Sequence, residues 1–316
     1  MRKFLAIVLT ALTLVACNEP TPTTPSQRIG FASEIGRSMT NSIEGLREQQ
    51  IRLYASYTLY GSNGRVFDAE RLYYNAEIPA WDYDNPQYWI MGAYYRFCAV
   101  SPYSTACTYS DNGELVINYE GSTYSQDVLY ATASRDLTNV DDFSTVLLHF
   151  RHACSAVQFS IVNGSNAALI DVRNIRLVGL YNKGDFRCSP DGVAAWSFKG
   201  SVLPAESDEH PFAGVCTLPE GGLPVNISVE HSLYDNGAIL VLPQSIYKSG
   251  VTLHLEYKKR GDSEYAVRNI ELGMLGGATP TEWKAGEVYK YKLNITDNTI
   301  TTEVKVIDWV DHYVDL

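Results

Sequence analysis

The sequence has little charge and little that predicts helix. Charged residues make up 19% of the 316 residues, whereas aromatic residues make up 12%. This balance favours half-buried β-strands over exposed helices that carry Glu–Lys pairs. The best candidate for a helix is one short segment, Ser42 to Glu48. The composition therefore predicts an all-β protein, and the length predicts two domains.

An excess of basic residues is also missing. The chain has 25 Lys and Arg against 36 Asp and Glu, which gives a formal net charge of -11. Without a basic stripe, binding to a phosphate backbone has no electrostatic source. We therefore expect no nucleic-acid partner.

Motifs that carry enzymatic chemistry are absent as well. The sequence has no His-Glu-x-x-His, no phosphate-cradling glycine motif and no Gly-x-Ser-x-Gly. His149 and His152 come nearest to a metal pair, but a separation of three places them on opposite faces of a strand. The Glu206 to His210 cluster lacks the glycine and the ligand spacing of a calcium loop, which favours a solvated loop. We predict that the protein is no enzyme and binds no metal or cofactor.

The six cysteines include no Cys-x-x-Cys pair of the kind that binds zinc or performs redox chemistry. Cys98 and Cys154 stand in apolar stretches, where a free buried thiol behaves as a small hydrophobic group. We therefore favour free cysteines in the core. A disulfide between Cys98 and Cys107 stays open.

The first hydrophobic run, Phe4 to Val15, is shorter than the roughly 20 residues that span a bilayer. It follows the basic pair Arg2-Lys3 and is typical of a secretory signal. Leu14-Val15-Ala16-Cys17 has the order bulky, any, small, Cys of a bacterial lipoprotein signal. We predict that residues 1–16 are removed, that Cys17 carries the lipid and that residues 17–28 form a flexible tether. The alternative is an ordinary signal peptide with Cys17 incidental.

Apolar and polar residues alternate in many short segments. Clear examples are Ile51/Leu53/Ala55/Tyr57/Leu59, Val146/Leu148/Phe150 and Tyr289/Tyr291/Leu293/Ile295. Such strands are expected to bury one face only, and turn signals such as Asn63-Gly64 separate them. The pattern predicts antiparallel β-sandwiches. A polar segment near residues 136–143 suggests an N-terminal domain over residues 29–142 and a C-terminal domain over residues 143–316.

A set of strand segments with fixed polar residues carries a family resemblance. The segments include Tyr95-Arg96-Phe97-Cys98-Ala99-Val100, Val146-Leu147-Leu148-His149-Phe150-Arg151-His152-Ala153, Ile239-Leu240-Val241-Leu242-Pro243-Gln244, Trp283-Lys284-Ala285-Gly286-Glu287-Val288-Tyr289 and Val304-Lys305-Val306-Ile307-Asp308-Trp309. In this order, and together with the lipoprotein signal, they make the chain resemble the fimbrillins, the lipoprotein pilins of type V fimbriae, in their Mfa-like branch. The resemblance covers nearly the whole mature chain.

The resemblance implies two transthyretin-like antiparallel β-sandwich domains and export as a lipoprotein. It also implies that an Arg- or Lys-specific maturation protease removes the lipidated N-terminus together with the first strand. A strand from another copy, or from a related fimbrial subunit, then fills the groove. The expected function is that of a structural and adhesive fimbrial subunit. The precursor would be held in the cell outer membrane by the Cys17 lipid, and the processed protein would join a cell-surface fimbrium.

A monomeric glycan-binding surface lipoprotein is the alternative function. It depends on the aromatic residues between Trp81 and Trp89, which either stack on a sugar or cap the core. The sequence leaves open whether the subunit belongs to the shaft, the tip or the anchor of a fimbria.

Arg37 is the predicted processing site, with Arg47 second. Arg37 follows the strand candidate Ile29 to Ile35 and precedes a polar stretch that a protease could bind in extended form. The alternative is that Arg37 is an ordinary surface arginine.

The C-terminus is the predicted donor strand. From Ile300 to Leu316 the even positions are mostly apolar, over about 55 Å at about 3.3 Å per residue. That is longer than most strands within one domain. We expect Ile300 to Ile307 to belong to their own domain, and Val310, Val314 and Leu316 to enter a neighbour. The alternative is a terminal strand that is satisfied within its own domain.

Overall fold

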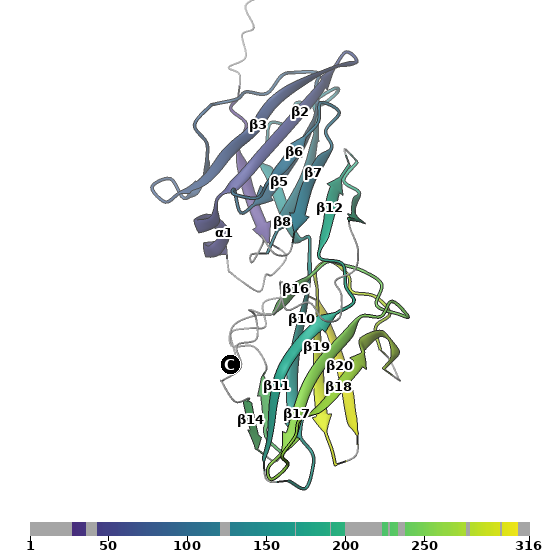
Figure 1. Cartoon of the computed structure of the whole chain (residues 1–316). Coiled ribbons are helices and arrows are strands. Elements are labelled where there is room, and N and C mark those ends of the chain that lie inside the picture. The colour runs from purple at the N-terminus through teal and green to yellow at the C-terminus, as the bar shows by residue number, and fades with distance from the viewer. Residues whose placement is uncertain are drawn as a thin grey trace, which may run out of the picture.

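The structure is a computed structural model, and it describes residues 27–35, 43–120, 127–167, 169–189, 191–199, 223–226, 228–232, 238–275, 279–297 and 299–308. Figure 1 shows two lobes arranged end to end, each built mainly of strands. In the described part, the helices are α1 (Ile43–Gln49), close to the predicted helix, and the short 3-10 helix η1 (Leu272–Met274). The prediction of an all-β protein is confirmed.

Seven strands of the first lobe pair in a closed ring. In hydrogen-bonded order they are β1 (Phe31–Ile35), β4 (Ala80–Asp82), β3 (Ser62–Asn75), β2 (Ile51–Leu59), β5 (Tyr94–Ser101), β8 (Leu129–Asp136) and β9 (Val146–His152). The ring closes through the parallel pairing of β1 with β9. Its interior is an apolar core that includes Phe31, Phe67, Phe97 and Phe150.

A second sheet packs against the outside of this ring. Its order is β13 (Ala194–Phe198), β12 (Lys183–Cys188), β7 (Leu115–Glu120) and β6 (Cys107–Tyr109). A second apolar cluster lies between the two layers, with Tyr54 from β2 and Val100 from β5. Tyr54 and Ser56 are therefore buried on the face of β2 that the alternation predicts to be exposed. The one-face prediction is wrong for this strand, because a second layer covers it.

Strand pairing crosses the boundary predicted between residues 142 and 143. β9 pairs with β8 and with β1, and β12 pairs with β7 along its whole length. The first lobe thus contains strands that this boundary assigns to the C-terminal domain. A local alternation of apolar residues predicts a strand, but it does not specify the sheet that the strand joins.

The second lobe consists of two sheets around one core. One sheet has the order β15 (Glu230–Ser232), β10 (Ser155–Asn163), β19 (Glu287–Ile295) and β20 (Ile300–Asp308), with β16 (Ile239–Val241) also paired to β10. The other has the order β14 (Leu223–Asn226), β11 (Leu169–Val178), β17 (Thr252–Lys259) and β18 (Ala266–Glu271). Phe159, Trp283 and Tyr291 lie in the core between them. The alternation predicted for the Tyr289 strand is confirmed.

The first hairpin turns earlier than its Asn-Gly pair predicts. β2 and β3 are joined through Tyr60 and Gly61, both with positive φ, and Gly64 already lies inside β3. A Cβ on Gly64 would stand 2.4 Å from the ring of Tyr57 across the strand pair. Gly64 therefore serves the close packing of that ring rather than a turn.

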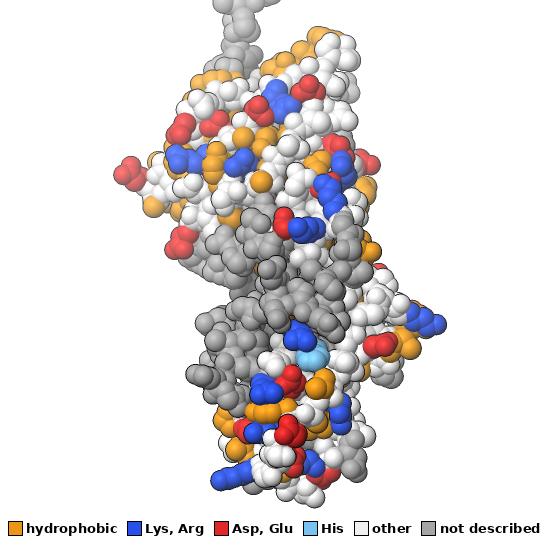
Figure 2. All heavy atoms as spheres, in the orientation of Figure 1, with side chains coloured by type: hydrophobic (Ala, Val, Ile, Leu, Met, Phe, Trp, Pro, Cys, Tyr) orange, Lys and Arg blue, Asp and Glu red, His pale blue; other side chains and the backbone are white. Residues whose placement is uncertain are grey.

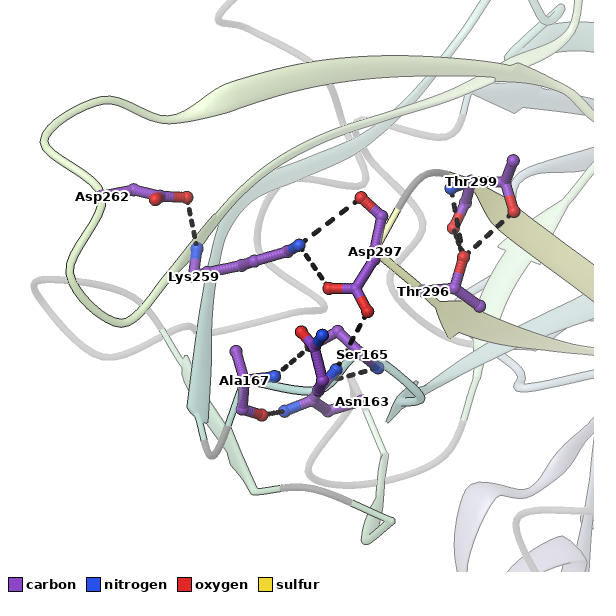
Figure 3. Close-up of polar contacts among 9 residues, drawn as sticks. Asn163, Ser165, Ala167, Lys259, Asp262, Thr296, Asp297 and Thr299 are labelled. Carbon is purple, nitrogen blue, oxygen red and sulfur yellow. Dashed lines mark hydrogen bonds and ion pairs between the residues drawn. The ribbon is translucent and has the colours of Figure 1, made fainter.

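Three turns are joined by polar contacts at the end of the second lobe that lies away from the first (Figure 3). Lys259 Nζ, at the end of β17, lies 2.6 Å from Asp297 Oδ1, between β19 and β20. The other carboxylate oxygen of Asp297 accepts the backbone N–H of Asn166, which follows β10. The buried Asn163 side chain donates to the carbonyl of Ala167 at 2.9 Å. These bonds satisfy backbone groups at loop ends and hold the turns together.

The chain first crosses between the lobes at Ala153 and Cys154, and it returns to the first lobe before β12. Trp196 from the second sheet donates its indole N–H to the carbonyl of Ala153 at 2.7 Å. The backbone N–H of Gly286, in the second lobe, donates to the carbonyl of Cys154 at 2.9 Å. Each lobe therefore holds one residue of the crossing.

Candidate functional site

β1 is the strand that closes the ring of the first lobe. It runs parallel to β9, with Phe31 opposite Val146 and Ile35 opposite Phe150. On its other side the pairing with β4 is confined to one position, Phe31 opposite Trp81. β1 is thus inserted between two strands that are distant in sequence, and it is bonded well to only one of them.

Backbone hydrogen bonds continue the pairing just before β1. Ile29 donates to the carbonyl of Gln87 at 2.9 Å, and Trp89 donates to the carbonyl of Gln27 at 3.1 Å. On the β9 side, the N–H of Val146 donates to the carbonyl of Gly30 at 2.8 Å. Without this segment, these donors and acceptors would lose their partners.

The side chains of this segment fill the middle of the ring. Ile29 is fully buried, and Phe31 makes edge-to-face contacts with Phe67, Tyr83 and Phe97 at centroid distances of 5.7, 5.8 and 5.8 Å. Tyr83 also donates its hydroxyl to the carbonyl of Ile29 at 2.7 Å. Removal of the segment would leave an apolar trench lined by aromatic rings.

Polar contacts fasten the rim of the same segment. Arg28 pairs with Asp82 at 2.6 Å, and its guanidinium lies 4.3 Å from the centre of the Tyr83 ring. Partial burial raises the pKa of Asp82, but the Tyr83 backbone N–H and Arg28 lower it below its usual range. Trp81 donates its indole N–H to Ser33 Oγ at 2.7 Å. These contacts tie the segment to β4 and to Tyr83 directly after it.

β20 is the second element of the candidate site, because it ends the described chain at the edge of its sheet. It pairs with β19 without interruption from Ile300 opposite Ile295 to Asp308 opposite Glu287. Ile300 and Val304 pack against the core, as the alternation predicts, but Val306 is 42% exposed. Ile307 instead packs on a small cluster formed by Ala156 and Val288 on the opposite face. The alternation therefore changes phase before β20 ends.

Comparison with known families and structures decides the class of the protein. The family model described as fimbrillin-like matches residues 37–309. The chain belongs to the fimbrillin-like family. No curated protein matches it.

Two solved structures are similar to this fimbrillin-like chain in fold. A fimbrial protein of Bacteroides vulgatus has 16% identity and a TM-score of 0.60, and the match covers 90% of this chain and 99% of that one. A candidate cell adhesion protein of Bacteroides uniformis has 16% identity and a TM-score of 0.50, with 90% and 98% covered. At this identity the likeness concerns the fold alone.

Most of the site residues predicted for the fimbrillin-like chain lie outside the described residues. They are the lipidation site Cys17, the cleavage site Arg37 and the donor residues Val310, Val314 and Leu316. The second cleavage candidate, Arg47, lies in α1, where its guanidinium stacks 3.8 Å from the centre of the Tyr74 ring. A helical, stacked arginine does not offer a protease an extended substrate. All of these assignments stay predictions.

The aromatic residues between Trp81 and Trp89 do not form an open platform. Tyr83 and Trp89 are buried in the core of the ring, and Trp81 is half-buried against Ser33. Tyr88 is exposed. This arrangement caps the core and does not favour the glycan-binding alternative.

The two histidines lie on opposite faces of β9, as their spacing predicts. His149 is exposed, whereas His152 is buried and pairs through Nδ1 with the buried carboxylate of Asp127. Sequence reasoning missed Asp127; the only signal was its place next to an apolar strand. The pair lies beside the crossing between the lobes, since Ala153 N–H donates to the carbonyl of Val128.

Cys98, Cys154 and Cys188 are buried and Cys107 is half-buried, all four as free thiols. The preference for core cysteines is confirmed for Cys98 and Cys154, and no bond joins Cys98 to Cys107. Among the described residues, no three His, Cys, Asp or Glu side chains are arranged to hold a metal ion.

No helix in the described ranges is long and apolar enough to cross a membrane. Figure 2 shows basic and acidic side chains interspersed over the visible described surface of both lobes.

Proposed function

We propose that this fimbrillin-like protein is a fimbrial subunit that is exported as a lipoprotein, processed at Arg37 and polymerised by strand exchange. The single observation that supports the proposal best is the position of β1 between β9 and β4. A short N-terminal strand fills an aromatic-lined slot between β9 and β4, and it ends at Ile35, two residues before the candidate cleavage site.

Cleavage after Arg37 would cut the covalent link between β1 and the rest of the protein. β1 would then be held only by the contacts of residues 27–35, and it would become replaceable by any strand of matching pattern. An exposed strand edge beside an apolar trench leaves backbone N–H and C=O groups unpaired and apolar side chains in water. Another strand can supply partners for both. Polymerisation would thus depend on cleavage.

The strand that fills the slot is proposed to come from the C-terminus of a second copy or of a related fimbrial subunit. β20 carries the chain to Asp308 at a sheet edge, so the residues after it continue from an outer strand. In this proposal Val310, Val314 and Leu316 would fill the slot that Ile29 and Phe31 fill before cleavage. Such a head-to-tail contact is heterologous and does not close on itself, so it builds a filament.

The lipid on Cys17 would hold the precursor in the outer membrane until the maturation protease acts. The cut would release the lipidated segment from the assembled subunit, and the processed subunit would pass to a cell-surface fimbrium. The lipid and the slot-filling strand lie on the same side of Arg37, so one cleavage would remove both.

The proposal is tested with the mature chain carrying Cys17→Ser, treated with an Arg-specific protease. We expect an N-terminus at Ser38 and a ladder of oligomers on unheated denaturing gels. Arg37→Gln should abolish both, and Arg47→Gln is the matched control that should leave both unchanged. Assembled material that begins before Ile29 would exclude removal of β1 as the trigger.

Deletion of residues 310–316 tests the donor separately. The truncated chain should be cleaved normally and stay monomeric, and it should accept a donor strand from added full-length chain. Normal ladders from the truncated chain alone would overturn the donor assignment. A truncated chain that fails to fold would instead favour a terminal strand satisfied within its own domain.

A further inference from the structure

Two thiols face each other where the second sheet packs on the ring of the first lobe. Cys98 lies in β5, and Cys188 is the last residue of β12; both are buried in the apolar cluster between the two layers. β12 comes from the part of the chain beyond the crossing between the lobes, so the two cysteines are far apart in sequence and belong to different layers.

Contacts of β12 place Cys188 along β8 and β5. Phe186 is two residues before Cys188 and therefore on the same face of β12. Its ring packs on Tyr130 of β8, with centroids 4.6 Å apart. Tyr130 is the register partner of Val100 in β5. Cys188 therefore faces a residue of β5 that is two positions away from Val100.

The turn after β12 fixes the direction of that step. A Cβ built on Gly192 would stand 3.4 Å from Thr132 Oγ1, so the turn lies beside Thr132. Thr132 is the register partner of Cys98. Cys188 lies between Phe186 and this turn. Its neighbour on β5 is therefore Cys98, on the Thr132 side of Val100.

The side chains themselves are in contact. The hydrogen bond with Cys188, together with burial, raises the pKa of Cys98 well above its usual value. The same bond and the nearby Arg151 guanidinium lower the pKa of Cys188, although burial opposes them. The nearby Arg151 guanidinium favours the thiolate of Cys188, which is the reactive form of a cysteine.

The other two described cysteines are engaged elsewhere. Cys107 contacts the hydroxyl of Tyr54 at 3.6 Å, on the side of β5 away from β8. Cys154 lies in the crossing between the lobes, where burial raises the pKa of its thiol far above the usual value. A thiol with so high a pKa forms little thiolate and is inert.

We propose that Cys98 and Cys188 are a disulfide-forming pair that joins the second sheet covalently to the ring. Closing the bond converts two thiols into one Sγ–Sγ bond and releases two protons and two electrons. The acceptor is the disulfide of a thiol–disulfide oxidoreductase or of oxidised glutathione, which is reduced to two thiols. Since both sulfurs are buried, the exchange takes place during folding, before the two layers close.

The bond would close a loop of about 90 residues, and cross-links across long loops restrict the unfolded chain most. The bond lies on the outer face of β5, whereas Phe31 of β1 contacts Phe97 on the inner face of the same strand. It would therefore hold the second sheet in place while a strand is exchanged. The inference rests on the proposed function in one respect, namely that the chain is exported to an oxidising compartment, where disulfides form. Its test in vitro is independent of export, processing and polymerisation.

The test is to refold the mature chain from denaturant in a glutathione redox buffer, block free thiols and map the peptides by mass spectrometry. We expect a Cys98–Cys188 linked peptide, lighter by two hydrogens than the two reduced peptides together. Reduction should lower the midpoint of thermal unfolding by about 5 °C or more.

Three variants make the result specific. Cys98→Ser and Cys188→Ser should each remove the linked peptide and the effect of reduction on the midpoint. Cys107→Ser is the matched control and should keep both. The proposal is overturned if Cys98 and Cys188 are recovered alkylated from the refolded, circular-dichroism-verified wild-type chain, or if the linked peptide joins Cys98 to Cys107.

Discussion

Phe31 of β1 lies edge-on against Phe97 of β5, with ring centroids 5.8 Å apart and planes at 77°. The first residue of the closing strand thus contacts a strand on another wall of the ring. β1 therefore fills the interior of the lobe and does not merely extend a sheet edge. This contact explains why replacement of β1 would have to supply an apolar side chain of comparable size.

Phe31→Ala should destabilise the chain strongly. Loss of a buried phenyl ring typically costs about 3–5 kcal/mol of unfolding free energy. Leu147→Ala, on the outer face of neighbouring β9, is the matched control and should change stability by less than about 1 kcal/mol. Urea denaturation followed by tryptophan fluorescence measures both, and equal midpoints would contradict the role of Phe31.

The phase change in β20 predicts unequal effects of two similar substitutions. Val304→Ala removes methyl groups that pack against the core, so we expect a loss of about 1 kcal/mol. Val306→Ala removes exposed groups and should stay within about 0.5 kcal/mol of the wild type. Chemical denaturation distinguishes them, and a larger effect at Val306 would mean that the alternation continues as the sequence suggests.

The second sheet should lose stability in acid through Asp185. Burial raises the pKa of Asp185, but hydrogen bonds from Lys199 and Asn118 and the charges of Lys199 and Arg187 lower it below its usual value. A carboxyl whose folded-state pKa is lowered contributes stability above its ordinary pKa of about 4. That contribution is lost as the pH falls through the lower folded-state pKa.

Asp185→Asn should therefore lower the urea midpoint at pH 7, and this difference from wild type should shrink as the pH falls below about 4. Trp196 on neighbouring β13 reports on the same sheet by fluorescence. Asp111→Asn is the control, because its 95% exposed carboxylate forms only a surface ion pair with Arg65. A constant difference between Asp185→Asn and wild type from pH 7 to pH 3 would refute the assignment.

Cys17→Ser should abolish fatty-acid labelling of the precursor and release it from membranes. The physical reason is that the Phe4 to Val15 run would be removed with the proposed signal, so the lipid would be the anchor that remains. Metabolic labelling and membrane fractionation measure the two effects. A Cys216→Ser variant serves as the control and should label normally, whereas a labelled Cys17→Ser chain would rule out the lipoprotein assignment.

Local periodicity was sufficient to predict several elements of this protein. β9 shows the strict alternation read from Val146 to Phe150, β19 buries Tyr289, Tyr291, Leu293 and Ile295, and α1 lies within one residue of its predicted start. These features depend on neighbours in sequence, so the chain alone determines them. The family resemblance likewise followed from the order of such segments.

The partners of each strand were decided only by the tertiary structure. Tyr54 is buried on a strand face that alternation assigns to solvent, because the second sheet covers it and its ring stacks on Tyr109 of β6. The hairpin turns at Tyr60 and Gly61, and Gly64 lies within β3 where the ring of Tyr57 packs over it. The sequence by itself determined which segments are strands and which of their residues repeat with period two. Which layers meet, and so which side chains face Cys188, depends on contacts between residues far apart in the chain, and no local pattern encodes these.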